Sequence, residues 1–385
     1  MKILMTGLLP PEKEQNNGGV VSVIRILLES FSEISDLEVC HVSFNKELKT
    51  PKVIEASSNI RLIFLPFKSR VDLIDYLLNR KTLDAIIAQE KPDLIHIQEI
   101  TPQLLRFLHL DRSKIVVTQH GIMKEELKYF DRLSTRLKGL FKALIERFVF
   151  PLFPNVLFIS EYSRGLFPRK PVFSEIIFNP VRKFFFNQDS STGDPNTILF
   201  AAAFSRIKNT GLLLSALAEL KKFGIICRLH LAGGFKNKYY ERLIQQTVAD
   251  LGLNDQVIFH GWCTPKKIQE LMSQCALFIL PSRQETMPVV IGEAMAMGRI
   301  VIASDVGAVS EMFTDGSSGF LFPDNDKDAL IAILKMVLFD PALRKRVSRN
   351  AALEAKNRFY PDLIAGKTLR FYEKILQHHS QPVSA

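Results

Sequence analysis

Two glutamates in the C-terminal half of the chain, Glu285 and Glu293, have a spacing that suits ligand binding. An apolar segment, 276–280, ends at Pro281-Ser282, and the glutamates bracket the loop that leads from it into a predicted helix. The spacing places Glu285 just before the helix N-terminus and Glu293 on its second turn. A helix N-terminus attracts anions through its unpaired N–H groups and its dipole. The carboxylates would repel an anion, so we expect them to bind neutral hydroxyl groups.

A second loop carries cations that suit a diphosphate. The segment 197–203 is typical of a strand, and the loop after it contains Arg206 and Lys208 ahead of an apolar helix. Lysine and arginine stabilise phosphate oxygens through charge-assisted hydrogen bonds. A ligand with a diphosphate between two hydroxyl-rich rings would satisfy both loops, and a nucleotide-sugar is such a ligand. The alternative for both cations is a solvated basic turn.

Strand-like and helical segments alternate along the chain, which indicates βαβ units and parallel sheets. A polar stretch with Gly and Pro, residues 187–196, is the best linker. We therefore predict two Rossmann-like domains, 1–185 and 186–360, followed in 361–385 by a helix that packs back on the first domain and a frayed tail. The predicted strands are 2–6, 39–44, 60–66, 93–98, 114–119, 155–160, 173–178, 197–203, 226–232, 256–260, 276–280, 300–303 and 319–322.

Composition narrows the class of protein. The 385 residues exceed the size of a typical single core, and the hydrophobic content of 47% suits packed domains. The four cysteines show neither metal-ligand spacing nor a disulfide framework, so we expect a reduced, cytoplasmic chain without a metal site or a cofactor. The first residues are typical of a strand and not of a signal peptide, and no apolar run is long enough to span a membrane.

Strand ends supply further candidates, because ligands bind beyond the carboxyl ends of the strands in open α/β sheets. His120 follows the segment 114–119 and is expected to point into the crevice between the domains. His96 lies inside another strand and is expected in the core. Gly18-Gly19 opens the first predicted helix, and by itself this glycine pair leaves two interpretations open, a ligand-binding turn and a flexible loop tip.

Several motifs resemble those of one known family. Glu293 begins the motif Glu-Ala-Met-Ala-x-Gly, and the blocks 304–311 and 315–320 follow it. With these motifs the chain resembles the retaining glycosyltransferases of family 4 over essentially its whole length, most strongly from 198 to 322. Ala308 stands where that family usually has a second glycine. The resemblance implies an α/β GT-B fold, in which two doubly wound domains face a crevice, and sugar transfer with retained anomeric configuration and no required metal.

The resemblance also implies roles for single residues. Glu285 would contact hydroxyls of the donor sugar near the reacting centre, Glu293 would bind ribose hydroxyls, and Lys208 would bind the phosphates. Arg206 stands near the place of the family's arginine and is expected to replace it, and His120 matches a histidine beside the transferred sugar. The expected catalytic residues are Glu285, His120, Lys208 and Arg206. The expected donor-binding residues are Gly18, Gly19, Lys208, Arg206, Gly233, Gly261, Thr286, Met287, Pro288, Val289 and Glu293.

Glycines that end two strands of the second domain, Gly233 and Gly261, are expected to let the backbone surround the nucleotide base, as in the family. The neighbouring Trp262 has two interpretations that the sequence leaves open. Its indole ring either stacks on the base or belongs to the core.

The expected function is transfer of a sugar from a UDP- or GDP-sugar to a glycan or lipid-linked acceptor, in the synthesis of a bacterial cell-surface polysaccharide. Two alternatives stay open, namely a nucleotide-sugar epimerase of GT-B fold and a non-catalytic nucleotide-sugar-binding subunit. The sequence identifies neither the sugar nor the acceptor, because fold analogy does not supply them.

Basic residues gather in the region 124–183, which holds twelve Lys and Arg against six Asp and Glu, or +6 of the chain's net charge of +10. Two interpretations are open: a core-facing stripe with a solvated basic back, which we favour, and a peripheral contact with an anionic membrane at its inner face. Nucleic acid is not expected as a partner, because no recognition motif accompanies the charge. The apolar stripe consists of Leu127, Phe130, Leu133, Leu137, Leu140, Leu144 and Phe148, with Lys128, Arg132, Lys138 and Lys142 between them.

Overall fold

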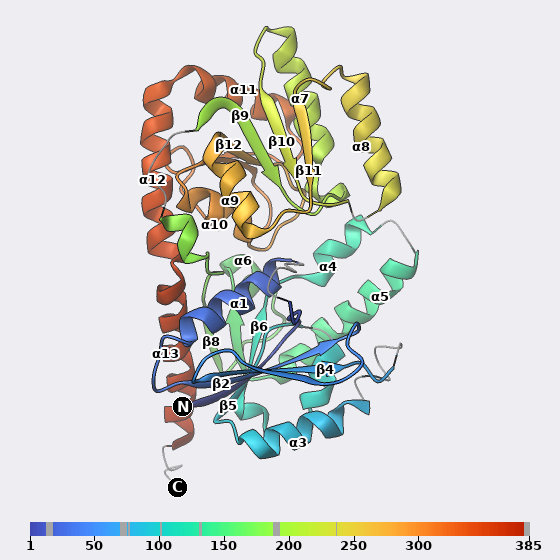
Figure 1. Ribbon diagram of the computed structural model, residues 1–385, viewed down its shortest axis with the longest axis vertical. Helices are drawn as coiled ribbons and strands as arrows, with labels where there is room; N and C mark the ends of the chain where they lie inside the picture. The colour runs from blue at the N-terminus through green and yellow to red at the C-terminus, as the bar shows by residue number, and fades with distance from the viewer. Residues whose placement is uncertain are drawn as a thin grey trace. The chain divides into compact units, whose positions relative to one another are not determined.

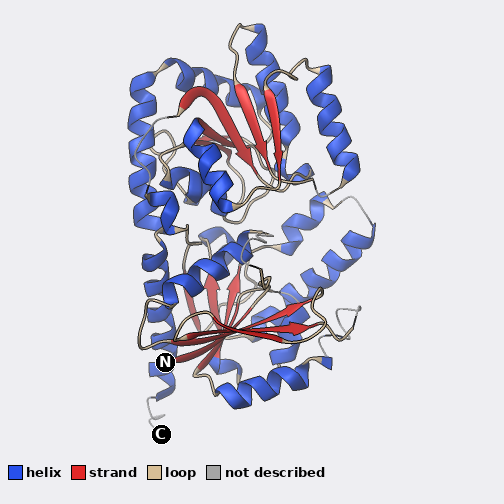
Figure 2. Cartoon of the chain, in the orientation of Figure 1, coloured by secondary structure: helices blue, strands red, loops and turns tan. Residues whose placement is uncertain are grey.

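The computed structural model describes residues 1–12, 18–69, 75, 78–100, 102–130, 133–187, 193–235 and 237–380. They form two compact units (Figure 1): Met1–Pro180 together with Pro361–Ala385, and Val181–Tyr360. Each unit contains a largely parallel β-sheet with helices around it (Figure 2). Among the residues that the structure describes, no helix has the length and apolar content that a membrane-spanning segment needs.

The sheet of the first unit has the strand order β3-β4-β2-β1-β5-β6-β7-β8. Neighbouring strands pair in parallel, with Ile3 opposite Val39 on one side and Leu94 on the other, except that β3 is antiparallel to β4. The strands are β1 Lys2–Thr6, β2 Glu38–Asn45, β3 Lys52–Glu55, β4 Ile60–Pro66, β5 Leu94–Ile97, β6 Ile115–Gln119, β7 Asn155–Phe158 and β8 Phe173–Ile176.

The sheet of the second unit has the order β11-β10-β9-β12-β13-β14, and all of its pairs are parallel. Its central strands β12 and β13 are buried along their whole length, as expected for parallel strands that helices cover on both faces. The strands are β9 Asp194–Ala201, β10 Arg228–Ala232, β11 Val257–Gly261, β12 Cys275–Leu280, β13 Ile300–Ser304 and β14 Phe320–Phe322.

Helices connect the strands in both units. Those of the first unit are α1 Gly19–Phe31, α3 Arg80–Glu90, α4 Met123–Glu126, α5 Leu133–Leu144, α6 Glu161–Gly165 and α13 Pro361–Ser380, with the π-helical turn η4 Ile145–Val149 after α5. Those of the second unit are α7 Thr210–Lys222, α8 Lys238–Asp250, α9 Pro265–Gln274, α10 Val289–Ala296, α11 Lys327–Phe339 and α12 Pro341–Phe359.

The chain passes from one unit to the other at a different place from the predicted boundary. The division falls between Pro180 and Val181 and not at residue 185. Hydrogen bonds of the second unit account for this, because Val181 N donates to Phe359 O over 2.9 Å and the side chain of Gln269 donates to Phe184 O over 2.6 Å. Residues 188–192 of the predicted linker and 381–385 of the predicted tail lie outside the described residues.

The helix α13 belongs to the first unit although it follows the second unit in sequence. It packs on α1, where Ser30 Oγ donates to the carboxylate of Asp362 over 3.3 Å. A proline at its first position separates it from α12, since the residue before a proline disfavours helical backbone and Tyr360 is extended.

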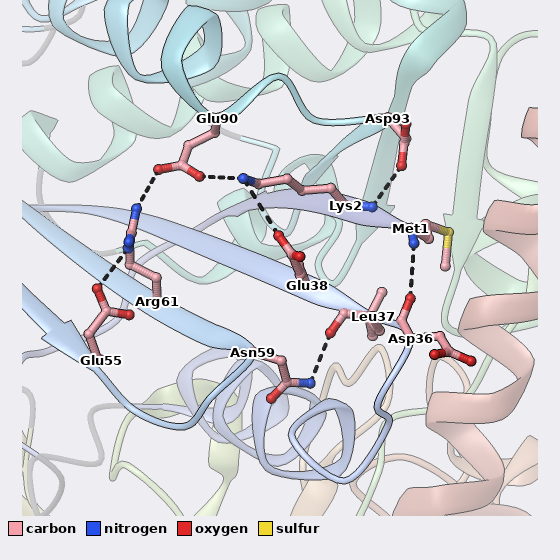
Figure 3. A network of polar contacts seen from close by, with 10 residues as sticks. All are labelled: Met1, Lys2, Asp36, Leu37, Glu38, Glu55, Asn59, Arg61, Glu90 and Asp93. Carbon is pink, nitrogen blue, oxygen red and sulfur yellow. Dashed lines mark hydrogen bonds and ion pairs between the residues drawn. The ribbon is translucent and has the colours of Figure 1, made fainter.

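A polar network fixes the amino-terminal edge of the first sheet (Figure 3). The Lys2 ammonium lies 2.9 Å from one oxygen of Glu90, and the Arg61 guanidinium lies 2.9 Å from the other. Burial raises the pKa of Glu90, but these two cations outweigh it and hold that pKa below its ordinary value. The network therefore joins β1, β4 and α3 at the edge opposite the strand ends that carry the candidate site.

Candidate active site

The strand order places the candidate residues of the second unit at a topological switch point. From β9 the chain builds β10 and β11 on one side, and then β12 and β13 on the other. The loops after β9 and β12 therefore diverge and leave a ligand-binding position between them. Lys208 lies in the first of these loops and Glu285 in the second.

An ion pair joins the two loops. Lys208 Nζ lies 2.5 Å from Glu285 Oε1, and the buried Ser282 donates its hydroxyl to the same oxygen over 2.6 Å. Ser304 Oγ in turn donates to Ser282 O. Because both bonds end on Oε1, neither of them occupies Oε2, and the carboxylate is held by β12 and the loop after β9 at once. Sequence reasoning singled out Glu285 and Lys208 but missed Ser282, although it stands three residues before Glu285.

The main chain of Glu285 is fixed by a glycine from the motif after β13. Gly307 has a φ of +58°, and a Cβ placed on it would lie 1.7 Å from Glu285 O. A glycine is therefore required here for both its backbone conformation and its lack of a side chain. The block 304–311, known from the sequence only as a motif, sets the position of the glutamate loop.

The loop 286–288 leads directly into α10. Pro288 is the N-cap, with φ −71° and ψ 112°, and Val289 is the first helical residue. The N–H groups at the start of a helix have no intrahelical acceptor, which makes those of Val289 and Val290 candidates for a ligand oxygen.

Glu293 lies on the second turn of α10, as the spacing predicted. Burial raises the pKa of its carboxyl group to about 7, against the opposing charge of Arg182. Sequence reasoning counted Arg182 only as part of the basic region, but this residue is buried and its charge acts on Glu293. Next to Glu293, Gly292 leaves room for Val181 and Phe359, since a Cβ on it would lie 2.8 Å and 3.3 Å from their side chains.

The stability of the protein is expected to report the titration of Glu293. Because the pKa of Glu293 is higher in the folded than in the unfolded protein, its protonation stabilises the fold. This contribution is fully present below pH 4.5, the ordinary pKa, and is lost as the pH rises through about 7. The loss amounts to roughly 2–3 kcal/mol. Urea unfolding of wild type and Glu293→Gln between about pH 4.5 and 7.5 measures it, because the amide cannot titrate. A pH-independent difference between the two proteins would contradict the prediction.

Arg206 does not share the position of Lys208. It is exposed at the start of the turn η7 Arg206–Lys208, and its charge acts on Tyr240 at the start of α8. Lys208 is thus the cation that the structure brings to Glu285.

Three glycines shape the loops after β10 and β11. Gly233 has a φ of +136°, and a Cβ on it would lie 1.8 Å from Ala202 O, while one on Gly234 would lie 1.9 Å from the indole nitrogen of Trp262. Gly261 has a φ of +65°. The Trp262 side chain is 66% exposed, so its interpretation as a core residue is wrong. The exposed indole ring over Gly234 is available to a flat ligand.

The first unit has its own switch point, between β1 and β5. Gly18 caps α1 with a φ of +142°, and a Cβ on it would meet no atom within 4 Å, so its conformation and not crowding requires glycine. The helix begins at Gly19. Residues 13–17 of the preceding loop lie outside the described residues.

His120 is part of a hydrogen-bonded group beside a small cavity. Its Nε2 lies 2.9 Å from Gln98 Oε1, and Gln98 Nε2 lies 3.3 Å from His96 Nδ1. His96 is buried and also bonds Thr118 over 2.7 Å and the Tyr372 hydroxyl of α13, which confirms it as a core residue. The cavity is lined by His96, Gln98, Thr118, His120, Asn179 and Thr368 among others.

This group defines the charge and the tautomer of His120. Burial lowers its pKa to about 4, although a hydrogen bond with Asn179 acts in the opposite direction. The imidazole is therefore neutral near pH 7. Since Gln98 Oε1 is an acceptor, His120 carries its proton on Nε2, and Nδ1 can accept a hydrogen bond from a hydroxyl group.

The nitrogen resonances of His120 are expected to keep the pattern of a neutral Nε2–H tautomer from about pH 8 down to about pH 5. Gln98→Leu removes the acceptor and is expected to raise the share of the Nδ1–H tautomer, whereas Gln98→Glu keeps an acceptor and preserves Nε2–H. Nitrogen-15 NMR of labelled protein measures both. Titration of His120 near its ordinary pKa of 6.5 would contradict the structure.

The structure overturns the favoured interpretation of the basic region. Leu133, Leu137, Leu140, Leu144 and Phe148 are exposed and do not face the core. Leu127 and Phe130 differ from these five residues of the stripe. They pack against Gly139, which lies on the other side of α5. Residues 131 and 132, including Arg132 of the predicted basic set, lie outside the described residues.

Metal ligands and thiols add little to this site. Within the described ranges, no cluster of three or more His, Cys, Asp or Glu side chains could hold a metal ion. The four cysteines are free, and three of them are buried.

Comparison with known families assigns both units. A model described as Glycosyltransferase Family 4 matches residues 17–181, and a model described as Glycosyl transferases group 1 matches residues 181–354. The chain belongs to the group 1 glycosyltransferases. The two matches meet at residue 181, which is also where the structure divides.

Relatives of this family member are distant or partial. It is 32% identical to an alpha-D-kanosaminyltransferase of Streptomyces kanamyceticus over 160 residues, which cover 41% of the chain and 40% of that protein. It is 23% identical to an uncharacterized glycosyltransferase of Methanocaldococcus jannaschii, over 97% of the chain and 99% of that protein. The matches to the first two curated relatives span only 40% and 30% of their lengths.

Solved structures show the fold. The sucrose-phosphate synthase of Thermosynechococcus elongatus superimposes with a TM-score of 0.81 at 20% identity, over 98% of this chain and 99% of that one. HepE of Anabaena, solved with UDP-glucose, gives a TM-score of 0.73 at 18% identity, over 97% and 100% of the two chains. The predicted GT-B fold with two Rossmann-like parallel-sheet domains is confirmed.

Proposed function

We propose that this protein transfers a sugar from a nucleotide diphosphate sugar to a glycan or lipid-linked acceptor, with retained configuration and without a required metal. The observation that carries the proposal is the ion pair of Lys208 and Glu285 at the switch point between β9 and β12, in front of α10. It combines a cation for phosphate oxygens, a carboxylate for sugar hydroxyls and a helix N-terminus in one place.

The donor is proposed to bind to the second unit. Lys208 has three N–H donors, so it can contact a phosphate oxygen while it still bonds Glu285. Glu285 Oε2 accepts from a hydroxyl of the sugar, and Glu293 accepts from ribose hydroxyls beside Arg182. The exposed Trp262 ring, with Gly233 and Gly261 next to it, supports the base. Arg206 is proposed to reach the outer phosphate from its exposed turn.

The chemistry follows from charge placement. As the bond between sugar and diphosphate breaks, negative charge builds on the leaving group, and Lys208 and the first N–H groups of α10 stabilise it. Glu285 is proposed to hold the sugar and not to attack it, because its charge is paired with Lys208 and its Oε2 accepts from a sugar hydroxyl. We therefore propose that the acceptor attacks from the face that the leaving diphosphate vacates, and that a phosphate oxygen takes the acceptor proton. His120 is proposed to accept a hydrogen bond from a sugar hydroxyl through Nδ1.

The first unit is proposed to bind the acceptor. Peripheral binding at the inner face of an anionic membrane would bring a lipid-linked acceptor to it, and cell-surface polysaccharide synthesis is the process that fits. A colanic acid biosynthesis protein of Salmonella typhimurium and an amylovoran biosynthesis protein of Erwinia amylovora are among the relatives, at 25% and 31% identity over parts of the chain.

A thermal-shift screen of nucleotide-sugars tests the donor, because a ligand stabilises the folded state by about 2.7 kcal/mol at 100 times its Kd. UDP-sugars come first, since HepE was solved with UDP-glucose and a mutant of TarM from S. aureus was solved with UDP. Release of UDP in the presence of water or an acceptor tests for turnover. NMR of the product then gives its anomeric configuration. Stabilisation without turnover would favour a binding subunit, and a 2-epimerised sugar would favour the epimerase. No stabilisation by any UDP- or GDP-sugar would contradict the proposal.

A further inference from the structure

We infer that the outward face of α5 and η4 is a docking surface for an anionic lipid bilayer. Six large apolar side chains lie on this face, and each is more than a third exposed in the full chain. The members of this surface, called here the α5 face, are Leu133 at 74%, Leu137 at 58%, Leu140 at 52%, Phe141 at 39%, Leu144 at 54% and Phe148 at 63% exposed.

The residues of the α5 face share one side of the helix. Their spacing of three or four residues repeats from residue 133 to residue 148, which aligns them along the axis. Exposed apolar patches of this extent are rare on soluble monomers and mark sites that contact a protein or a membrane.

The opposite side of the same helix is firmly packed, so the α5 face is not a core face turned outward. Gly139 is buried, and a Cβ on it would lie 2.5 Å from Leu127 and 2.8 Å from Phe130. Ile145 is 5% exposed and belongs to the core of the first unit. Glu146 accepts from the Gln119 side chain and from Met123 N, both over 2.9 Å. Figure 1 shows α5 beside α4, the helix on which it packs.

The charges beside this face select the partner. Beside the α5 face lie the exposed cations Arg136, Lys138 and Arg147, whereas the single acid of the segment 133–149, Glu146, is bound on the inner side. A helix with an apolar face, flanking cations and no outward carboxylate matches the chemistry of a bilayer with anionic headgroups. A second copy of the chain is a poorer partner, because pairing two such faces would bring like charges together.

The inference deepens the proposed function, and it rests on that function only for its purpose, the delivery of a lipid-linked acceptor to the first unit. The surface itself depends on exposure and charge alone. Its members come from a helix that supplies none of the residues of the Lys208–Glu285 pair or of the His120 group.

Flotation of the full chain with lipid vesicles tests the inference. Wild type is expected to float with phosphatidylcholine vesicles that contain phosphatidylglycerol, and less at high salt, because screening weakens the attraction. Leu144→Glu with Phe148→Glu is expected to abolish flotation. Arg136→Gln, Lys138→Gln and Arg147→Gln together should weaken binding on the order of 100-fold, from about a fivefold loss for each basic residue. Phe339→Glu, at an equally exposed residue of α11, is the matched control and should float like wild type.

The outcomes separate the inference from the proposed function. Equal flotation of wild type and the α5 variants, or flotation indifferent to phosphatidylglycerol, would overturn it. Absence of flotation together with a dimer that the variants abolish would assign the face to self-association instead. Stabilisation by UDP is measured on the same proteins. If UDP stabilises all of them but wild type does not float, the docking surface is wrong and the proposed function stands; the reverse result removes the proposed function and leaves the surface.

Discussion

Lys208→Ala is expected to lower the rate of sugar transfer on the order of 100- to 1,000-fold, the cost of losing one positioned group that stabilises transition-state charge. The ammonium is the cation that the structure places 2.5 Å from Glu285, between the two diverging loops of the second sheet. Its loss removes positive charge from the position where the leaving diphosphate develops negative charge. Steady-state kinetics with a donor identified by thermal shift measure the effect, and we expect the larger part of it in kcat.

Lys222→Ala is the control for this variant. Lys222 lies at the end of α7, is 71% exposed and pairs with Glu219 on the surface of the same unit. Exposed pairs of this kind contribute little to stability, so the control should retain normal kinetics. If Lys208→Ala keeps a near-normal rate while it still binds donor, Lys208 is not the phosphate cation and the site assignment fails.

Gly307→Ala is expected to reduce both stability and transfer, the latter on the order of 100-fold, the loss that follows from a misplacement of about 1 Å. A methyl group on Gly307 would lie 1.7 Å from Glu285 O, so the glutamate loop has to move. In addition, a φ of +58° costs a non-glycine residue about 1–2 kcal/mol. Urea unfolding and kinetics on the same protein separate the two effects.

Gly316→Ala is a matched control for the effect of backbone conformation on stability. Gly316 has a φ of +69°, and a Cβ on it would meet no atom within 4 Å. It should therefore lose stability through its conformation alone and keep its rate of transfer. Equal stability and equal rates of the two variants would show that contact with Glu285 O has no consequence, and would contradict the role given to Gly307.

The sequence predicted the buried strands well, for a physical reason. Parallel strands covered on both faces are continuous apolar runs, and every predicted strand has a counterpart in the structure. The strand β3 was missed because it is a mostly exposed antiparallel edge strand, and Val53 is 57% exposed. Such strands lack the apolar run that identifies the others.

The candidate site was predictable where it depends on local order along the chain. The positions of Glu285 and Glu293 follow from strand, loop and helix in succession. The contacts of Ser282, Arg182 and Gly307 depend on which strands are neighbours, and the pairing of β9 with β12 and of β12 with β13 is not written in local periodicity. The same limit explains the α5 face, because a helical period identifies an apolar stripe but not the element that covers it.

The packing around Gly292 has a practical consequence for anyone who wishes to cut the chain. The helix that carries Glu293 rests on Val181 and Phe359, the first and the penultimate residue of the unit Val181–Tyr360, and Val181 N donates a hydrogen bond to Phe359 O. A fragment that started at residue 186 would lose Val181 and Arg182 together, and with them one support of α10 and the charge beside Glu293. Both ends of this unit thus support its ligand site, and a truncated protein should retain them.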